Sequence, residues 1–160
     1  MINLIRINSD NSDFRALVAL LDRELQIRDG DEHSFYAQFN KIDKIRHVVI
    51  AYEDGEAVGC GAIKEYAKGV VEIKRMFVRT ARRGRGIAKS ILSELETWAN
   101  ELDFSECILE TGWKQPEAIA LYQKNGYETI PNYGQYSGIE NSVCMRKLIR
   151  DDSKIFCKTS

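Results

Sequence analysis

The chain has 160 residues, of which 44% are hydrophobic and 29% are charged, and this composition suits one soluble globular domain with its own core. Its net charge of −1 provides no overall field that would recruit nucleic acid or an anionic membrane, and no apolar run approaches the roughly 18 residues of a membrane span. The first residues also lack the layout of a signal peptide. We therefore expect a cytoplasmic protein without a nucleic-acid or membrane partner.

The cysteines and histidines argue against disulfides and metal. Four cysteines show no C-x-x-C spacing, so we expect buried free thiols in a reducing cytoplasm. The two histidines stand far apart in the sequence, and we therefore predict no zinc site and no other metal. The cysteines are Cys60, Cys107, Cys144 and Cys157.

The first part of the chain predicts one strand and two helices. Ile2 to Ile7 alternates loosely between apolar and polar residues, as in a strand, and Ser12 is placed to cap the helix that follows. Asp29-Gly30-Asp31 ends that helix, and a short second helix is predicted over His33 to Phe39. The first helix has apolar residues at helical spacing, namely Phe14, Leu17, Val18, Leu21 and Leu25.

A hairpin is predicted next. His47 to Tyr52 has the pattern of a strand, Asp54-Gly55 is a strong turn signal, and Ala57 to Ile63 returns as the partner strand. Gly59 and Gly61 are unusual inside a strand. They indicate a bulge or a close neighbour packed against the backbone.

The centre of the chain predicts a strand, a loop and a helix in that order. Val70 to Val78 is long enough for a central strand, and an amphipathic helix is predicted from about Gly86 to Leu102. The N–H groups of the loop and of the first helical turn lack partners and lie at the positive end of the helix dipole, which favours a bound phosphate. Gly84 and Gly86 allow a close approach because they have no Cβ. Further charge-assisted contacts are expected from Arg79, Arg82, Arg83 and Arg85.

The remaining elements complete an α/β pattern. Cys107 to Thr111 predicts a short parallel strand, Pro116 the first turn of a helix that continues over Glu117 to Lys124, and Asn125-Gly126 its end. Two further strands are predicted from Tyr127 to Ile130 and over Ser142 to Ile149. We therefore expect a single α/β (α+β) domain over residues 1–150, with a mixed sheet of about seven strands and about four helices, followed by an unassigned tail at 151–160.

Three stretches resemble a known family, and the first is the strand from Glu72 to Val78, which ends five residues before Arg83 and matches the family's splayed central strand. Arg83-Gly84-Arg85-Gly86-Ile87-Ala88 is similar to the R/Q-x-x-G-x-G/A pyrophosphate loop of the GCN5-related N-acetyltransferases, the GNAT superfamily. Gln115 to Tyr127 resembles that family's N-x-x-A-x-x-L-Y-x-x-x-G-F segment. The chain departs from this last pattern at both ends, where Gln115 replaces Asn and Tyr127 replaces Phe, although Gln can still donate and accept hydrogen bonds.

The resemblance implies a GNAT-like fold and acetyl-coenzyme A as the acyl donor, without a metal. The loop amides would hold the cofactor's diphosphate, and backbone groups at the end of the splayed central strand would meet its pantetheine arm. A backbone N–H near Phe77 or Val78 is the expected oxyanion donor. The implied cofactor-binding residues are Met76, Phe77, Val78, Arg83, Gly84, Arg85, Gly86, Ile87, Ala88 and Gln115.

Acetyl transfer to an amine needs a neutral amine, a polarised carbonyl and a proton for the departing thiolate. We expect direct transfer without a covalent enzyme intermediate. By resemblance Tyr122 is the general acid, and Glu72 occupies the position of the glutamate base in histone acetyltransferases. Each residue also has a structural alternative. Tyr122 could be a half-buried aromatic residue of its helix, and Glu72 could pair with Lys74 or with a cation on a neighbouring strand. Glu110 and a water relay are further candidates for the base.

The acceptor is expected near the first two helices and the loop from Pro131 to Gly138. Acidic residues there suit a cationic amine, and a solvated charged turn explains those around Asp31 equally well. The chain is thus predicted to be an N-acetyltransferase for the primary amine of a small molecule. One alternative is that the acceptor is a protein N-terminus or lysine, and another is that the chain is a non-catalytic acyl-coenzyme A sensor. The sequence leaves the oligomeric state open, including a homodimer. The predicted acceptor-binding residues are Asp31, Glu110, Tyr133 and Tyr136.

Overall fold

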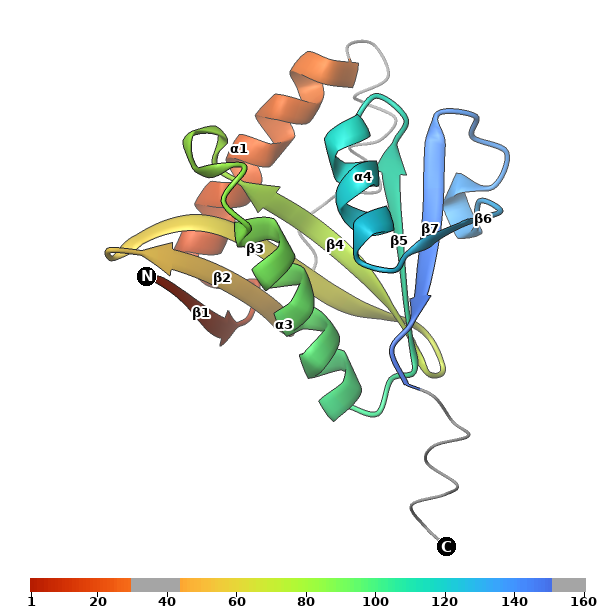
Figure 1. The fold of residues 1–160 in the computed structure, drawn as a ribbon, viewed down its shortest axis with the longest axis horizontal. Helices are drawn as coiled ribbons and strands as arrows, with labels where there is room; N and C mark the ends of the chain where they lie inside the picture. The colour runs from red at the N-terminus through yellow and green to blue at the C-terminus, as the bar shows by residue number, and fades with distance from the viewer. Residues whose placement is uncertain (30–43, 151–160) are drawn as a thin grey trace, which may run out of the picture. The chain divides into compact units, whose positions relative to one another are not determined.

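A computed structural model describes residues 1–29 and 44–150 of the chain. The predicted helix at 33–39, Asp31, Cys157 and the tail at 151–160 lie outside the described residues. The strands form one mixed sheet in the order β1-β2-β3-β4-β5-β7-β6 (Figure 1). They are β1 (Ile2–Ile7), β2 (His47–Glu53), β3 (Glu56–Ala67), β4 (Val70–Val78), β5 (Glu106–Gly112), β6 (Glu128–Ile130) and β7 (Ser142–Leu148). The described α-helices are α1 (Ser12–Asp29), α3 (Ile87–Glu101) and α4 (Pro116–Lys124), and two 3₁₀ turns are η2 (Thr80–Arg82) and η3 (Gly134–Tyr136).

The chain divides into two compact units. Unit 1 comprises Met1–Lys64 and Lys74–Leu95, and unit 2 comprises Glu65–Ile73 and Glu96–Ser160. The strands β3 and β4 and the helix α3 therefore contribute residues to both units. Among the helices of residues 1–29 and 44–150, none has both the length and the apolar character that a membrane crossing requires.

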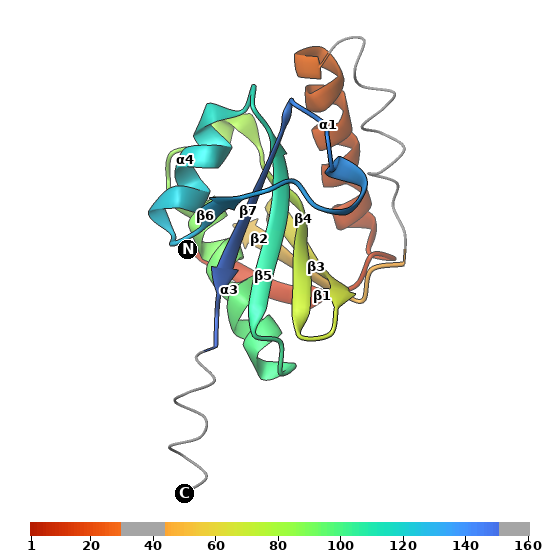
Figure 2. The same cartoon turned by 90° about the vertical axis from the view of Figure 1, so that its right-hand side faces the viewer.

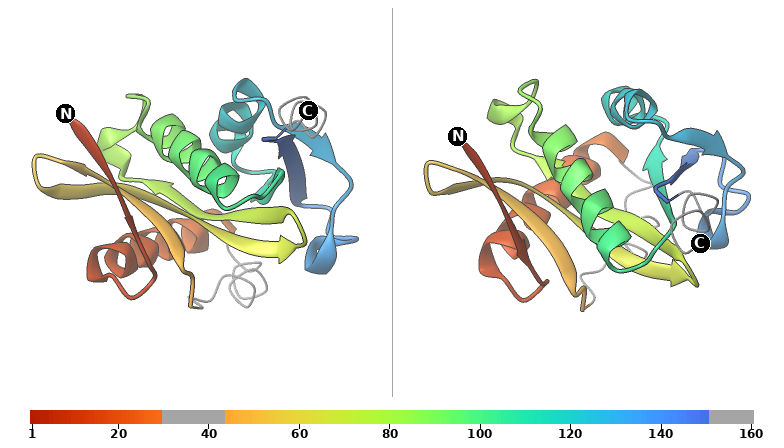
Figure 3. Two further views of the ribbon diagram at one scale, coloured as in Figure 1. Left: turned by 90° about the horizontal axis from the view of Figure 1, so that it is seen from below. Right: turned by 60° about the horizontal axis from the view of Figure 1, so that its bottom comes forward.

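Unit 1 places helices on both faces of its strands. Figure 3 shows α1 on one face of β2 and β3 and the first part of α3 on the other. The helix α1 begins at Ser12, but its cap is Asn11, whose side-chain oxygen accepts hydrogen bonds from the N–H groups of Asp13 and Phe14 at 2.8 and 3.1 Å. The predicted Ser12 cap is therefore wrong by one position, because Ser12 is already the first helical residue. The core on the α1 face includes Phe14, Leu17, Val18, Val48, Ile50, Cys60 and Ala62.

The predicted hairpin of β2 and β3 is confirmed. Asp54 and Gly55 form its turn with φ values of 51° and 81°, as a two-residue hairpin turn requires. The predicted close packing at the strand glycines is also confirmed. A Cβ at Gly61 would lie 2.5 Å from the sulfur of Met76 and 2.9 Å from two α3 side chains, and a Cβ at Gly59 would lie 3.0 Å from Ile91. The helix α3 therefore packs directly against the backbone of β3.

Unit 2 contains β5, β6, β7, α4 and the start of β4. The strand β7 lies between β5 and β6 (Figure 2). The strand β5 is parallel to β4, with Val70 beside Glu106 and Glu72 beside Ile108, as expected for strands joined through a helix. Pro116 opens α4, whose last residue precedes Asn125 at the C-cap and a glycine with a φ of 93°.

The predicted fold class, a mixed α/β fold with about seven strands, is confirmed. Cys60, Cys107 and Cys144 are free and buried, as predicted. Burial raises the pKa of Cys60 and of Cys107 to about 12, so these thiols are protonated and unreactive near neutral pH. The prediction of one domain over residues 1–150 with a separate tail stays a prediction.

Candidate functional site

The predicted phosphate loop lies in unit 1, between β4 and α3. Gly84 and Gly86 have φ values of 79° and 81°, and a Cβ added at either position would meet nothing within 4 Å. Within the described part of the chain, the N–H groups of Gly84, Arg85 and Gly86 donate no hydrogen bond to another backbone group. The first turn of α3, which begins at Ile87, carries no acidic residue. The loop therefore presents open backbone amides at a helix N-terminus, an arrangement that suits an anion.

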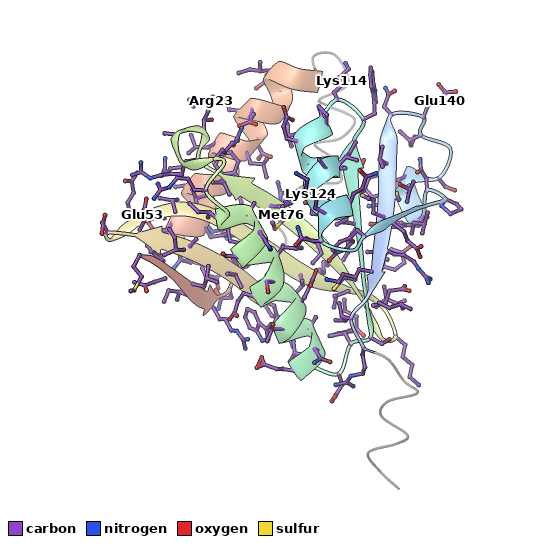
Figure 4. The ribbon with its side chains drawn as sticks, in the orientation of Figure 1. Arg23, Glu53, Met76, Lys114, Lys124 and Glu140 are labelled. Carbon is purple, nitrogen blue, oxygen red and sulfur yellow. The ribbon has the colours of Figure 1, made fainter. Side chains whose placement is uncertain are left out.

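Two of the loop arginines are held by the hairpin of β2 and β3. Arg85 makes a bidentate pair with Glu53, at 3.0 and 2.5 Å, and Figure 4 shows Glu53 at the hairpin end of β2. The hydrogen bonds from Arg85, opposed by desolvation, lower the pKa of Glu53. Arg82 contacts the same Glu53 at 3.1 Å and Glu56 at 3.2 Å. These side chains thus tie the loop to the hairpin.

The other two arginines tie the loop to β3, β4 and α1. Arg83 donates to Glu24 of α1 at 2.7 Å and to the carbonyl of Val78 at 2.9 Å, and its guanidinium lies over the Phe77 ring at 5.6 Å. Arg79 donates to a β3 carbonyl at 2.7 Å. All four arginine side chains therefore have partners in this structure, and their predicted contacts to phosphate stay predictions.

The end of β4 supplies the residues predicted to meet the pantetheine arm. Phe77 and Val78 are buried, and Met76 points toward α3 (Figure 4). Arg75 immediately before them has a φ of 60°, which is unusual for a non-glycine residue in a strand. Such local backbone irregularities are concentrated at functional sites. The end of β4 is therefore the irregular part of an otherwise regular strand.

A groove of about 500 Å³ lies beside the loop within unit 1. Its apolar lining comes from α1 and β4, and its charged lining from α1 and the loop. This groove gives the loop a concave neighbour on the α1 side. The lining residues are Leu20, Arg23, Glu24, Ile27, Phe77, Arg79, Thr80 and Arg83.

The predicted base lies in unit 2 with a partner that the sequence did not indicate. The Glu72 side chain is buried, and the hydroxyl of Tyr133 donates to its Oε2 at 2.6 Å. Burial, followed by the charge of Glu72, raises the pKa of Tyr133. Tyr133 therefore keeps its proton and acts as a donor to Glu72.

A second hydroxyl and carboxylate pair lies nearby in the same unit. The hydroxyl of Ser142 on β7 donates to Oε2 of Glu110 on β5 at 2.7 Å. Tyr136 is buried, and its ring is edge-on to Tyr133 at 5.7 Å. Burial, then the charges of Glu110 and Glu72, raise the pKa of Tyr136. Four predicted catalytic or acceptor-binding residues, Glu72, Glu110, Tyr133 and Tyr136, thus lie in one cluster.

Tyr122 lies on α4 and is 6% exposed, so the structure gives it the burial expected for either a packed aromatic or a protected acid. Its ring is edge-on to Tyr127 at 5.7 Å. Burial, followed by the charge of Glu110, raises the pKa of Tyr122, which keeps it protonated through the neutral range. Gln115 stands at the N-cap of α4 and makes no side-chain cap hydrogen bond.

The predicted residues thus fall into two groups. Those from Met76 to Ala88 belong to unit 1, whereas Glu72, Tyr122, Gln115 and the described acceptor-binding residues belong to unit 2. Sequence reasoning missed the carboxylates that hold the loop arginines and the hydroxyls that hold the two carboxylates. No local signal could have identified them, because Tyr133 and Glu72 are 61 positions apart.

Comparison with known proteins identifies the family. Residues 14–127 of the chain match the model of the family described as Acetyltransferase (GNAT) family. The chain belongs to this GNAT family. Among curated GNAT relatives, it is 38% identical to an IAA acetyltransferase of Azospirillum brasilense over 100 residues, which are 62% of this chain and 65% of that protein. It is 39% identical over 85 residues to YjgM, an uncharacterised N-acetyltransferase of Escherichia coli, covering 51% of this chain and 50% of YjgM. The chain thus spans between half and two thirds of the length of these relatives.

Solved structures agree with the GNAT assignment. A crystal structure from Klebsiella pneumoniae, provisionally assigned as an acyl-CoA N-acyltransferase, is 32% identical with a TM-score of 0.80, and the match covers 94% of this chain and 99% of that one. PaiA N-acetyltransferase from Thermoplasma acidophilum, solved in complex with coenzyme A, has the same fold at 17% identity, with a TM-score of 0.68 over 92% of this chain and 99% of PaiA. The predicted family is therefore confirmed.

Proposed function

We propose that this protein is an acetyl-coenzyme A-dependent N-acetyltransferase that passes the acetyl group directly to the primary amine of a small molecule. The observation that carries the proposal is the loop in unit 1, where Gly84 and Gly86 leave open space before unbonded amides at the start of α3. A Cβ at either glycine would fill that space, so the residues present fit a bound diphosphate. GNAT membership supports the reaction class. The coenzyme A in the PaiA structure supports the donor.

The donor would be held by backbone and side-chain groups of named residues. The amides from Gly84 to Ala88 would bind the diphosphate, and the backbone from Met76 to Val78 would align the pantetheine arm. When bound, acetyl-coenzyme A supplies an acetyl group on a thioester. A backbone N–H near Phe77 or Val78 would polarise its carbonyl oxygen.

We assign the acid to Tyr122 and the base to Glu72. The raised pKa of Tyr122 keeps the phenol protonated, so that it has a proton to give to a departing thiolate, although the same shift makes it a weaker acid. Glu110 and a water relay are the alternatives for the base. Direct transfer is supported by the thiol pKa values of about 12 at Cys60 and Cys107, which argue against either cysteine as a nucleophile.

A small cationic amine is the acceptor that we favour. Glu72 and Glu110 would attract a positive charge, and Tyr133 and Tyr136 of the same unit would offer aromatic faces to it. The names of similar proteins do not agree on one acceptor. They include IAA acetyltransferase and, at 19% identity, a ribosomal-protein-alanine N-acetyltransferase from Brucella melitensis.

Incubation with acetyl-coenzyme A and a panel of amines tests the proposal. Free thiol release is followed continuously, and the products are identified by mass. An acetylated small amine is the expected result, whereas modification of protein N-termini or lysines alone would support a protein acceptor. Coenzyme A binding without turnover on any amine would favour the sensor, and absence of coenzyme A binding would overturn the proposal.

A further inference from the structure

We propose that Tyr133 is the positioning residue of the base: its hydroxyl donates to the Glu72 carboxylate and holds it in one orientation, and this selects Glu72 over Glu110. The inference rests on the proposed N-acetyl transfer. It adds a residue that acts through the assigned base.

The contact between the two side chains is short and protected. The hydroxyl of Tyr133 donates to Oε2 of Glu72 at 2.6 Å, a length typical of a hydrogen bond to a charged oxygen. Glu72 is 7% exposed and lies on β4, where it is beside Ile108 of β5. A hydrogen bond to the ionised form of a buried carboxylate stabilises that form, which is the form a general base needs.

The ring of Tyr133 is held on two sides. The Tyr66 ring lies edge-on at 5.1 Å and the Tyr136 ring edge-on at 5.7 Å. The backbone of the loop is also fixed, because Tyr136 donates its N–H to the carbonyl of Tyr133 at 2.9 Å and the Asn132 side chain donates to the carbonyl of Ile139 at 2.7 Å. The hydroxyl of Tyr133 is therefore aimed by packing rather than by its contact with Glu72 alone.

The hydroxyl of Ser142, which donates to Glu110 at 2.7 Å, is less constrained than that of Tyr133, because a serine side chain carries no ring that neighbours could hold. Glu110 is also less buried than Glu72. Titratable groups that act on this cluster from other elements of unit 2 include Glu110 on β5, Cys144 on β7, Tyr136 on η3 and, through Glu110, Tyr122 on α4.

This arrangement places the donor to the base on the loop from Pro131 to Gly138, which the sequence predicts to meet the acceptor. A change in that loop would therefore change the base as well as amine binding. Mutations in the loop should alter kcat and its pH dependence, and not only KM.

The test compares pH profiles of kcat/KM for the wild type, Tyr133→Phe and Ser142→Ala. Phenylalanine keeps the packed ring and removes only the hydroxyl. Loss of this donor should disfavour the charged carboxylate, so the acidic limb of the profile should move to higher pH. Ser142→Ala is the matched control, because it removes the equivalent donor from Glu110, and its acidic limb should stay in place.

An unmoved limb in Tyr133→Phe, or an equal shift in both variants, would overturn the inference. A lower plateau with an unmoved limb would give Tyr133 a structural role only. A second measurement reads the contact without turnover: the ¹³C signal of the Tyr133 ring carbon that bears the hydroxyl, assigned with Tyr133→Phe, should shift at neutral pH in Glu72→Gln, because the hydroxyl loses a charged acceptor, and no change would also overturn the proposal. A wild type that acetylates no amine refutes the proposed function instead, and the ring signal then still reports whether the contact forms.

Discussion

Replacement of Gly86 by alanine should weaken coenzyme A binding much more than it weakens the fold. An added Cβ at Gly86 meets nothing within 4 Å, so alanine carries only the cost of a φ of 81°, which is about 1–2 kcal/mol. For a chain of this size, each kcal/mol lowers Tm by about 2–4 °C. The same Cβ would occupy the space that we assign to the diphosphate. Loss of one hydrogen bond to a charged group, about 1.5–3 kcal/mol, corresponds to an increase in Kd of about 10- to 150-fold.

Gly55→Ala is the matched control for this prediction. Gly55 also has a φ of 81° with nothing within 4 Å of an added Cβ, but it belongs to the turn between β2 and β3. Calorimetric titration with coenzyme A gives Kd, and thermal unfolding gives Tm. The two variants should lose similar stability, and Gly55→Ala should bind coenzyme A nearly as tightly as the wild type. Equal Kd values for the two variants would refute the assignment of the loop to the diphosphate.

Three further predictions concern the acid, the core and the thiols. Tyr122→Phe should lower kcat by about 10²-fold or more without changing coenzyme A affinity, and unchanged kcat would exclude the acid role. Because burial raises the pKa of Tyr122, the alkaline limb of the wild-type pH profile should not come from this residue. Gly61→Ala should lower the free energy of unfolding, measured in urea, by about 1–3 kcal/mol, because the added Cβ would lie 2.5 Å from the Met76 sulfur. An unaltered urea midpoint would mean that the neighbouring side chains relax freely. At pH 8, iodoacetamide should leave Cys60 and Cys107 unmodified until denaturant is added, because the pKa of each thiol is about 12. If peptide mapping found these cysteines alkylated in the native protein, that result would contradict their burial.

The elements with local signals were predicted closely. The strands at Ile2–Ile7 and Val70–Val78 have the expected bounds, and α4 begins at Pro116 and ends before Asn125. These signals act within a few residues, through side-chain alternation, a fixed φ or a helix cap. The cap of α1 was missed because Asn11 and Ser12 are adjacent and both are good cap residues, so composition does not choose between them.

The side-chain partners of the site could not be predicted in the same way. The sequence identifies Glu72 as a carboxylate on a strand, but its hydroxyl partner depends on where the chain after β6 passes. The Arg85 pair with Glu53 likewise depends on the hairpin and the loop meeting across 32 positions. Resemblance to GNAT proteins supplied candidate roles, whereas these contacts required the register of the sheet and the path of the loops.

The arginine contacts also determine which part of the loop gives it affinity for an anion. Carboxylates of Glu24, Glu53 and Glu56 contact the arginine side chains, so much of the positive charge that the sequence suggests is balanced within unit 1. Ion pairs at a protein surface are weak, so a phosphate could displace them, but part of its attraction to the arginines would be lost in doing so. The open amides and the dipole of α3 require no such exchange. We therefore expect anion binding to depend chiefly on the backbone, and for this reason a glycine substitution tests the site more directly than removal of an arginine.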